Sequence, residues 1–138
     1  YAGRWLGGDP AALDAFGMSG TVWEYSMATE EWNAETFGLT KPDGTEYPMA
    51  SAVIRPYARA IAGTSIVTSF DSAARTFRAS WVPAQPGISE IALPPRAYEG
   101  GYDLALSGAC FDGSKPGTLA IASSGSGPVT VELRPRAH

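Results

Sequence analysis

Apolar and polar residues alternate through most of the second half of the chain. Phe77, Ala79 and Trp81 share one face of the segment 76–82, while the residues between them are polar. A period of two in a segment rich in aromatic residues is typical of a half-buried strand. Comparable segments recur between glycine, proline, serine and aspartate clusters, as SIVTSF, TFRASWV, ISEIALP, YDLALSG, TLAIAS and PVTVELR. Six short strands at this spacing predict an antiparallel β-sandwich over residues 64–138.

The first half of the chain has a different pattern. Residues 9–16 predict a helix, because Asp9 suits an N-cap and Pro10 suits the first helical position. Residues 18–25 read as a buried strand that contains valine, tryptophan and tyrosine. Residues 48–62 repeat apolar side chains every four positions and predict a second helix, kinked at an internal proline.

A single strand cannot form a sheet, so residues 1–63 need further polypeptide to cover their apolar faces. We therefore expect the chain to be the C-terminal piece of a larger protein, and its first residue is Tyr rather than Met. The long segment 26–47 joins the predicted strand to the second helix. Loops of this length are usually functional or disordered, and its aromatic residues argue against disorder. Its KPDGT sequence predicts a turn.

Charge and composition exclude several kinds of chemistry. The net charge is −4 and the basic residues do not cluster, so we expect no nucleic-acid partner. Cys110 and His138 are the only cysteine and histidine, which argues against a histidine-dependent triad, a zinc site and an internal disulfide. No cofactor or metal is expected, and acid–base chemistry would depend on carboxylates, tyrosines or a partner chain.

Several stretches resemble glycoside hydrolase family 5 enzymes of the endoglycoceramidase type. They are GTVWEYS, the later FGL, VIRPYARAIAG, TSFDSAARTF and EIALPPRAYEGGYDLALSGAC, which together span most of the chain. The resemblance implies an α+β fragment: the last helix–strand–helix of a (β/α)8 TIM barrel, followed by a C-terminal antiparallel β-sandwich. Residues 9–16 would be helix seven, 18–25 strand eight and 48–62 helix eight. The barrel part would cover residues 1–63, and the sandwich residues 64–138.

The same resemblance implies retaining hydrolysis by two glutamates, an acid and a nucleophile. Both would lie upstream of Tyr1, so this chain would contain no catalytic residue and would be inactive alone. Its expected partners are the N-terminal remainder of the enzyme and a glycoside, with the glycan–ceramide linkage of glycosphingolipids as the favoured substrate. A secreted bacterial enzyme is expected, with a peripheral contact to membranes or micelles.

The candidate substrate-binding residues are Trp23, Glu24, Trp32 and Phe37. The resemblance implies that Trp23, at the end of barrel strand eight, stacks on the sugar beside the scissile bond. Glu24 could accept a hydrogen bond from a sugar hydroxyl or form a structural ion pair with an arginine. Trp32 and Phe37 could line an aglycone groove with Met27, or could pack the loop.

The sandwich residues leave further alternatives open. Trp81, Tyr98 and Tyr102 could form a glycan platform, although strand positions favour core packing. The alternative function is then a stand-alone β-sandwich that binds carbohydrate or membrane without catalysis. Arg55 and Arg59 lie four apart on the predicted helix and should have carboxylate partners.

The single cysteine has a simpler interpretation. Cys110 lies between Ala109 and Phe111, and we expect it to be a buried apolar side chain.

Overall fold

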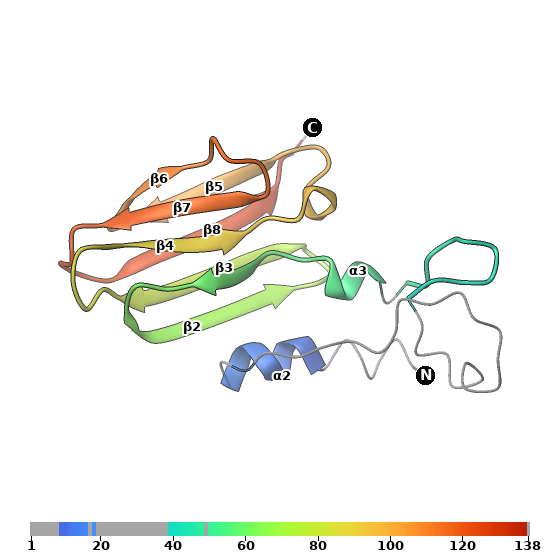
Figure 1. Ribbon diagram of the computed structural model, residues 1–138, viewed down its shortest axis with the longest axis horizontal. Coiled ribbons are helices and arrows are strands. Elements are labelled where there is room, and N and C mark those ends of the chain that lie inside the picture. Colours follow the sequence, from blue (N-terminus) through green and yellow to red (C-terminus); the bar gives the residue numbers. More distant parts are fainter. Residues whose placement is uncertain (1–8, 17, 19–38, 49, 138) are drawn as a thin grey trace. The chain divides into compact units, whose positions relative to one another are not determined.

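The computed structural model describes residues 9–16, 18, 39–48 and 50–137 (Figure 1). The chain divides into two compact units, Tyr1–Ile54 and Arg55–His138. Trp23, Glu24, Trp32 and Phe37, with almost the whole predicted strand 18–25, lie outside the described residues.

The first unit contains the predicted helix and the predicted turn. Helix α2 spans Asp9–Phe16, which is the range predicted from the sequence. In the KPDGT turn, Gly44 adopts a φ of 82° and donates its N–H to the carbonyl of Lys41 over 2.9 Å. An antiparallel bridge between Thr40 and Glu46 closes this loop.

The helix predicted over residues 48–62 is wrong. Helix α3 covers only Ala50–Val53, and strand β1 runs from Tyr57 to Ala60. Pro56 lies between them, is fully buried, and has no N–H with which to continue a helix. The next residues pair with strand β4 instead, since Tyr57 faces Ala92 in the register. The division between the units therefore falls after Ile54, ahead of the expected boundary at residue 63.

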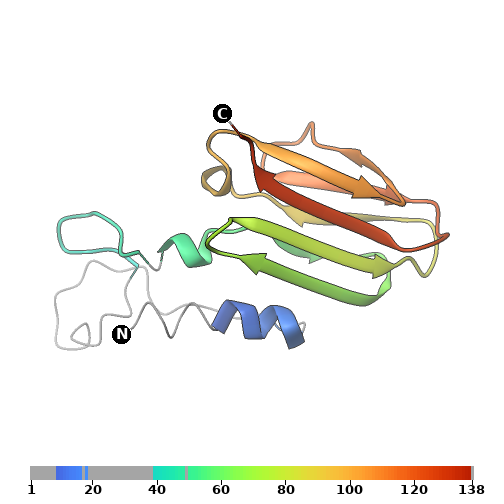
Figure 2. The ribbon, with the colours of Figure 1, turned by 180° about the vertical axis from the view of Figure 1, so that it is seen from behind.

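The second unit is an antiparallel β-sandwich of two four-stranded sheets, as predicted (Figures 1 and 2). One sheet has the order β1-β4-β7-β6 and the other the order β2-β3-β8-β5. The six predicted strands are present, and β1 and the short β6 complete the sheets. The strands after β1 are β2 (Thr64–Asp71), β3 (Thr76–Val82), β4 (Gly87–Ala92), β5 (Tyr102–Ser107), β6 (Cys110–Asp112), β7 (Thr118–Ser123) and β8 (Val129–Pro135).

The alternating residues form the core between the two sheets. Phe77 and Trp81 of β3 are 0% and 1% exposed, and Val129, Val131 and Leu133 of β8 are buried beside them. From the facing sheet come Ile91, Leu119 and Ile121, each fully buried. One face of each strand therefore provides the apolar burial that stabilises the sandwich, as its period of two predicts.

Four short connections cross between the sheets at one end of the sandwich. They are residues 61–63, 83–86, 108–109 and 124–128. This end is on the left in Figure 1 and on the right in Figure 2. Gly108 allows the tightest of these crossings, because its φ is 78° and a Cβ there would lie 2.3 Å from the carbonyl oxygen of Pro128.

Candidate functional site

The predicted substrate-binding residues lie outside the described residues, and the next described segment along the chain is 39–48. In this segment Asp43 accepts hydrogen bonds from the N–H of Thr45 over 2.9 Å and from its hydroxyl over 2.6 Å. These hydrogen bonds lower the pKa of the exposed Asp43 carboxyl, with a smaller contribution from Lys41. Asp43 therefore stabilises a turn as an ionised carboxylate, which makes it a poor proton donor.

Trp81, Tyr98 and Tyr102 do not form a glycan platform on the sandwich. Trp81 is 1% exposed inside the core, and Tyr98 and Tyr102 pack against that core from its margin. The two tyrosine rings lie 5.9 Å apart between centroids, at 44° to each other. The structure supports the core-packing interpretation, since a sugar needs an exposed aromatic face.

Tyr98 connects three elements of the sandwich. Its hydroxyl lies 3.0 Å from the carbonyl oxygen of Arg75 and 3.2 Å from that of Leu133, and it can donate to either. In return the Arg75 guanidinium donates to the carbonyl of Ala97 over 2.8 Å. Burial raises the pKa of Tyr98, so its hydroxyl keeps its proton to a higher pH than that of an exposed tyrosine.

The outer face of the sheet β2-β3-β8-β5 carries a shallow hollow of about 520 Å³. Its floor consists mostly of small, apolar and hydroxyl side chains, among them Val67, Ser80, Ala105 and Thr130. None of the residues that line it is aromatic. The hollow is therefore unlike a sugar-stacking site, and its charged lining residues are the ion pair Arg78 and Glu132.

That ion pair is part of a charged row across the sheet. Glu132 accepts a hydrogen bond from the Nε of Arg78 over 2.6 Å, and it also pairs with Arg134. The hydrogen bond from Arg78 is the largest cause of the lowered pKa of Glu132. A carboxylate held ionised between two arginines cannot serve as a general acid near neutral pH. The hollow therefore has no catalytic pair.

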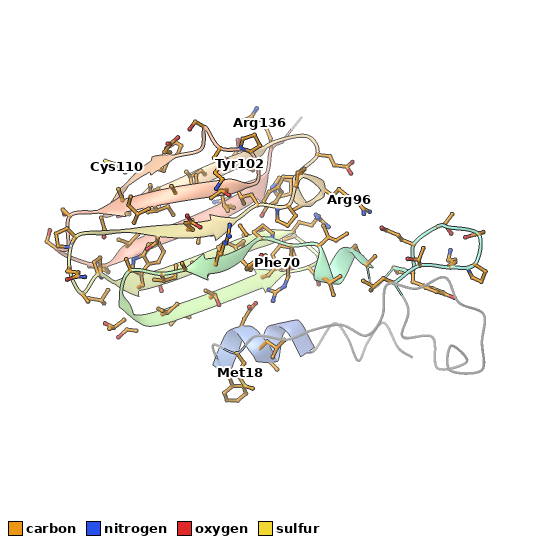
Figure 3. The ribbon with its side chains drawn as sticks, viewed as in Figure 1. Met18, Phe70, Arg96, Tyr102, Cys110 and Arg136 are labelled. Carbon is orange, nitrogen blue, oxygen red and sulfur yellow. The ribbon has the colours of Figure 1, made fainter. Side chains whose placement is uncertain are left out.

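The remaining candidates in the sandwich have mixed outcomes. Arg59 pairs with Glu90 over 3.8 Å, so it has the expected carboxylate partner, although it lies on a strand. The guanidinium of Arg55 lies 5.9 Å from the centre of the Phe70 ring. Cys110 is exposed, and its predicted burial is wrong because it starts the short edge strand β6 opposite the exposed Ala122 (Figure 3).

No group of three His, Cys, Asp or Glu side chains among the described residues is arranged to hold a metal ion. In the same part of the chain, no helix is both long enough and apolar enough to cross a bilayer.

Comparison with known protein families identifies the sandwich. Residues 55–132 match the glycoside hydrolase family 5 C-terminal domain. This match covers more than half of the chain. It begins at Arg55, which is also the first residue of the second unit. The chain belongs to glycoside hydrolase family 5. A comparison with curated proteins finds no match.

Solved structures of two proteins that are named as glycosidases share the fold. Endo-glycoceramidase II from Rhodococcus sp. is 24% identical to the chain with a TM-score of 0.71, over 99% of this chain and 30% of that one. Sterylglucosidase 1 from Cryptococcus neoformans is 19% identical with a TM-score of 0.56, over 68% of this chain and 15% of that one. The chain thus spans under a third of the length of either protein. Because the first alignment covers 99% of this chain, it extends beyond the sandwich.

Sequence reasoning missed strands β1 and β6. The sequence of β1, YARA, has only one strongly strand-forming residue, and the helical period around it obscured the strand. Strand β6 has three residues, too few for a period to be visible. The buried Pro56 was the available signal for β1, because a proline suits the start of an edge strand better than the middle of a helix.

Proposed function

We propose that this chain is the C-terminal piece of a retaining glycosidase that releases a glycan from an apolar aglycone. The favoured bond is the glycan–ceramide linkage of glycosphingolipids. The acid and the nucleophile are two glutamates on polypeptide upstream of Tyr1, and the chain alone is inactive. Secretion from a bacterial cell and a peripheral contact with membranes or micelles belong to the same proposal.

The alignment of almost the whole chain with 30% of Endo-glycoceramidase II carries this proposal. The family 5 match supports a glycosidase, and the names of both solved relatives refer to a sugar joined to a lipid. The first unit provides a second argument, because Phe16 and Met18 are 78% and 63% exposed. Large apolar side chains so exposed are expected where further polypeptide packs.

In this proposal the sandwich braces the barrel, and residues of the first unit contact the substrate. Trp23 stacks on the sugar next to the scissile bond, and Glu24 accepts a hydrogen bond from a sugar hydroxyl. Trp32 and Phe37 line the groove for the aglycone. The aromatic side chains gain from the burial of apolar area, and they exclude water from the reacting bond.

The decisive experiment uses the complete enzyme, expressed with the polypeptide upstream of Tyr1. We expect it to release glycan from a glycosylceramide with retention of anomeric configuration, which proton NMR of the released sugar measures. We expect the 138-residue chain alone to be inactive. Inversion, or hydrolysis by the 138-residue chain, would refute the assignment of the glutamates.

The role of Trp23 can be tested in the same enzyme. Trp23→Ala should lower kcat/KM about 10-fold or more, the equivalent of about 1.4 kcal/mol of lost transition-state binding. Trp23→Phe keeps an aromatic face and should recover part of that loss. If both variants matched the wild type, Trp23 would not contact the sugar.

A binding module without catalysis remains the alternative function. It predicts that the complete protein binds glycans or vesicles while hydrolysing no glycoside, and that residues of the sandwich carry that affinity. The buried Trp81 and the partly buried, core-packed Tyr98 and Tyr102 weigh against a glycan-binding module of the aromatic-platform kind.

A further inference from the structure

Charge is distributed unevenly along the sandwich. One end of the sandwich contains the four connections that cross between the sheets and the strand ends that flank them. This region covers residues 61–67, 82–88, 107–111 and 122–130. None of these residues is Asp, Glu, Lys or Arg. We call this region the uncharged end. The eight basic and six acidic residues of the second unit all lie outside it.

The strand register places these four segments together. Gly87 pairs with Ser123, Thr64 pairs with Val82, and the loops between the sheets join the same strand ends. Strand β1 begins at the opposite end, where Tyr57 pairs with Ala92, and strand β8 also finishes there. Figure 3 shows this separation, with Cys110 at the uncharged end and Arg96 and Arg136 at the other.

The uncharged end also has most of the exposed apolar side chains. The second unit, described without a gap from residue 55 to residue 137, exposes six large hydrophobic residues. Five of them lie at the uncharged end: Ile66, Val67, Val82, Ile88 and Phe111. Val67 and Ile88 are the most exposed, at 64% and 65%. They come from different sheets, so both sheets expose apolar side chains at this end of the sandwich.

This combination fits contact with a neutral lipid surface. Placing a charged side chain against hydrocarbon is unfavourable, so a surface without charge suits a contact that dips into a membrane. Around the five apolar residues stand exposed hydroxyls such as Ser124, Ser126 and Thr130, which can hydrogen-bond to lipid headgroups. We propose that the uncharged end rests on the lipid surface that holds the substrate, an inference that depends on the proposed glycolipid-directed function.

The charge balance predicts the kind of lipid that binds. The second unit has a net charge of +2 and residues 1–54 have −6, which gives −4 for the chain. With no basic residue at the contact, an anionic membrane gains no attraction there and is repelled by the chain as a whole. Binding to phosphatidylcholine should therefore be at least as strong as binding to vesicles with added phosphatidylserine, and on pure phosphatidylcholine it should be insensitive to salt.

Vesicle co-sedimentation of the complete enzyme tests the surface. Val67→Glu and Ile88→Glu should each lower partitioning onto pure phosphatidylcholine vesicles about 10-fold. Tyr57→Glu is the matched control, because Tyr57 is 48% exposed but lies at the charged end, and it should bind like the wild type. Thermal unfolding establishes that each variant is folded. Equal partitioning of all four proteins, or binding that requires phosphatidylserine, would overturn the proposal.

Two further readouts distinguish a lipid contact from a damaged active site and from a protein interface. Activity on a soluble aryl glycoside should be unchanged in Ile88→Glu, while hydrolysis of a vesicle-embedded glycosylceramide should fall with its partitioning. A wild-type enzyme that binds vesicles but cleaves neither substrate would contradict the proposed function and leave the lipid surface supported. A change in sedimentation velocity on Ile88→Glu without vesicles would instead identify the uncharged end as a protein interface and overturn the lipid contact.

Discussion

Replacement of Tyr98 by phenylalanine removes one hydroxyl and leaves the ring in place. That hydroxyl can donate to the carbonyl oxygens of Arg75 and Leu133, which belong to the turn after β2 and to β8. Arg75 has a φ of 50°, an uncommon conformation for a residue with a side chain. We therefore expect Tyr98→Phe to loosen the β2–β3 turn as well as to remove a hydrogen bond.

The expected magnitude follows from the chemistry of the contact. The Tyr98 hydroxyl has one proton, so it donates to one of the two carbonyl oxygens or divides a single hydrogen bond between them. A hydrogen bond between neutral groups contributes about 1 kcal/mol to the free energy of unfolding. For a domain of about 60–100 residues, 1 kcal/mol lowers the melting temperature by about 4–8 °C. The loss should depend on pH. Because burial raises the pKa of Tyr98 in the folded state, this stability is present below the unfolded value of about 10 and is lost as pH rises through the folded value.

Circular dichroism of thermal unfolding at pH 7 and pH 11 measures both effects. Tyr57→Phe is the matched control, because it deletes the same atom from a tyrosine that is 48% exposed, and it should leave the melting temperature unchanged. The gap between wild type and Tyr98→Phe should be largest at pH 7 and narrower at pH 11. Identical melting temperatures at pH 7 would show that the hydroxyl contributes nothing, and a gap that widened at pH 11 would contradict the sign of the pKa shift.

Three further predictions concern the sandwich. Gly108→Ala should destabilise the protein by about 2 kcal/mol or more, whereas Gly127→Ala, at a similar φ of 77° with no atom nearby, should cost less; equal costs in urea titrations would exclude the close approach to Pro128. The lowered pKa of Glu132 contributes stability above its unfolded pKa of about 4.3, and this stability is lost as the pH falls through the folded pKa. Glu132→Gln should therefore lose less stability than the wild type on acidification below about pH 4.3, and an unchanged acid profile would show that Glu132 has no such role. Cys110 should react with a thiol reagent in the native protein; labelling only after denaturation would restore the prediction of burial.

Local patterns identified six of the eight strands of the sandwich but not the backbone conformation of the region before them. The alternation in β3 and β8 identifies the buried face, since each strand has one apolar side that only the facing sheet can cover. Residues 48–62 also have a clear period, yet most of them are not helical. The four-residue period of apolar side chains predicted a helix there. The backbone conformation was instead decided by Pro56, which cannot continue a helix, and by pairing of the next residues with the edge of β4. The predicted substrate residues Trp23, Glu24, Trp32 and Phe37 stay a prediction, because they lie outside the described residues.

The amino-acid sequence by itself determined which faces of the strands are buried, where the main turns fall and which segments carry no charge. These properties depend on neighbours along the chain, so a linear pattern contains them. Only the tertiary structure showed that β1 joins the sandwich, that Cys110 is exposed, and that four distant uncharged segments meet at one end. Each of these depends on strand pairing between residues far apart in the sequence, and the pairing is selected by burial and by backbone hydrogen bonds that no local pattern specifies.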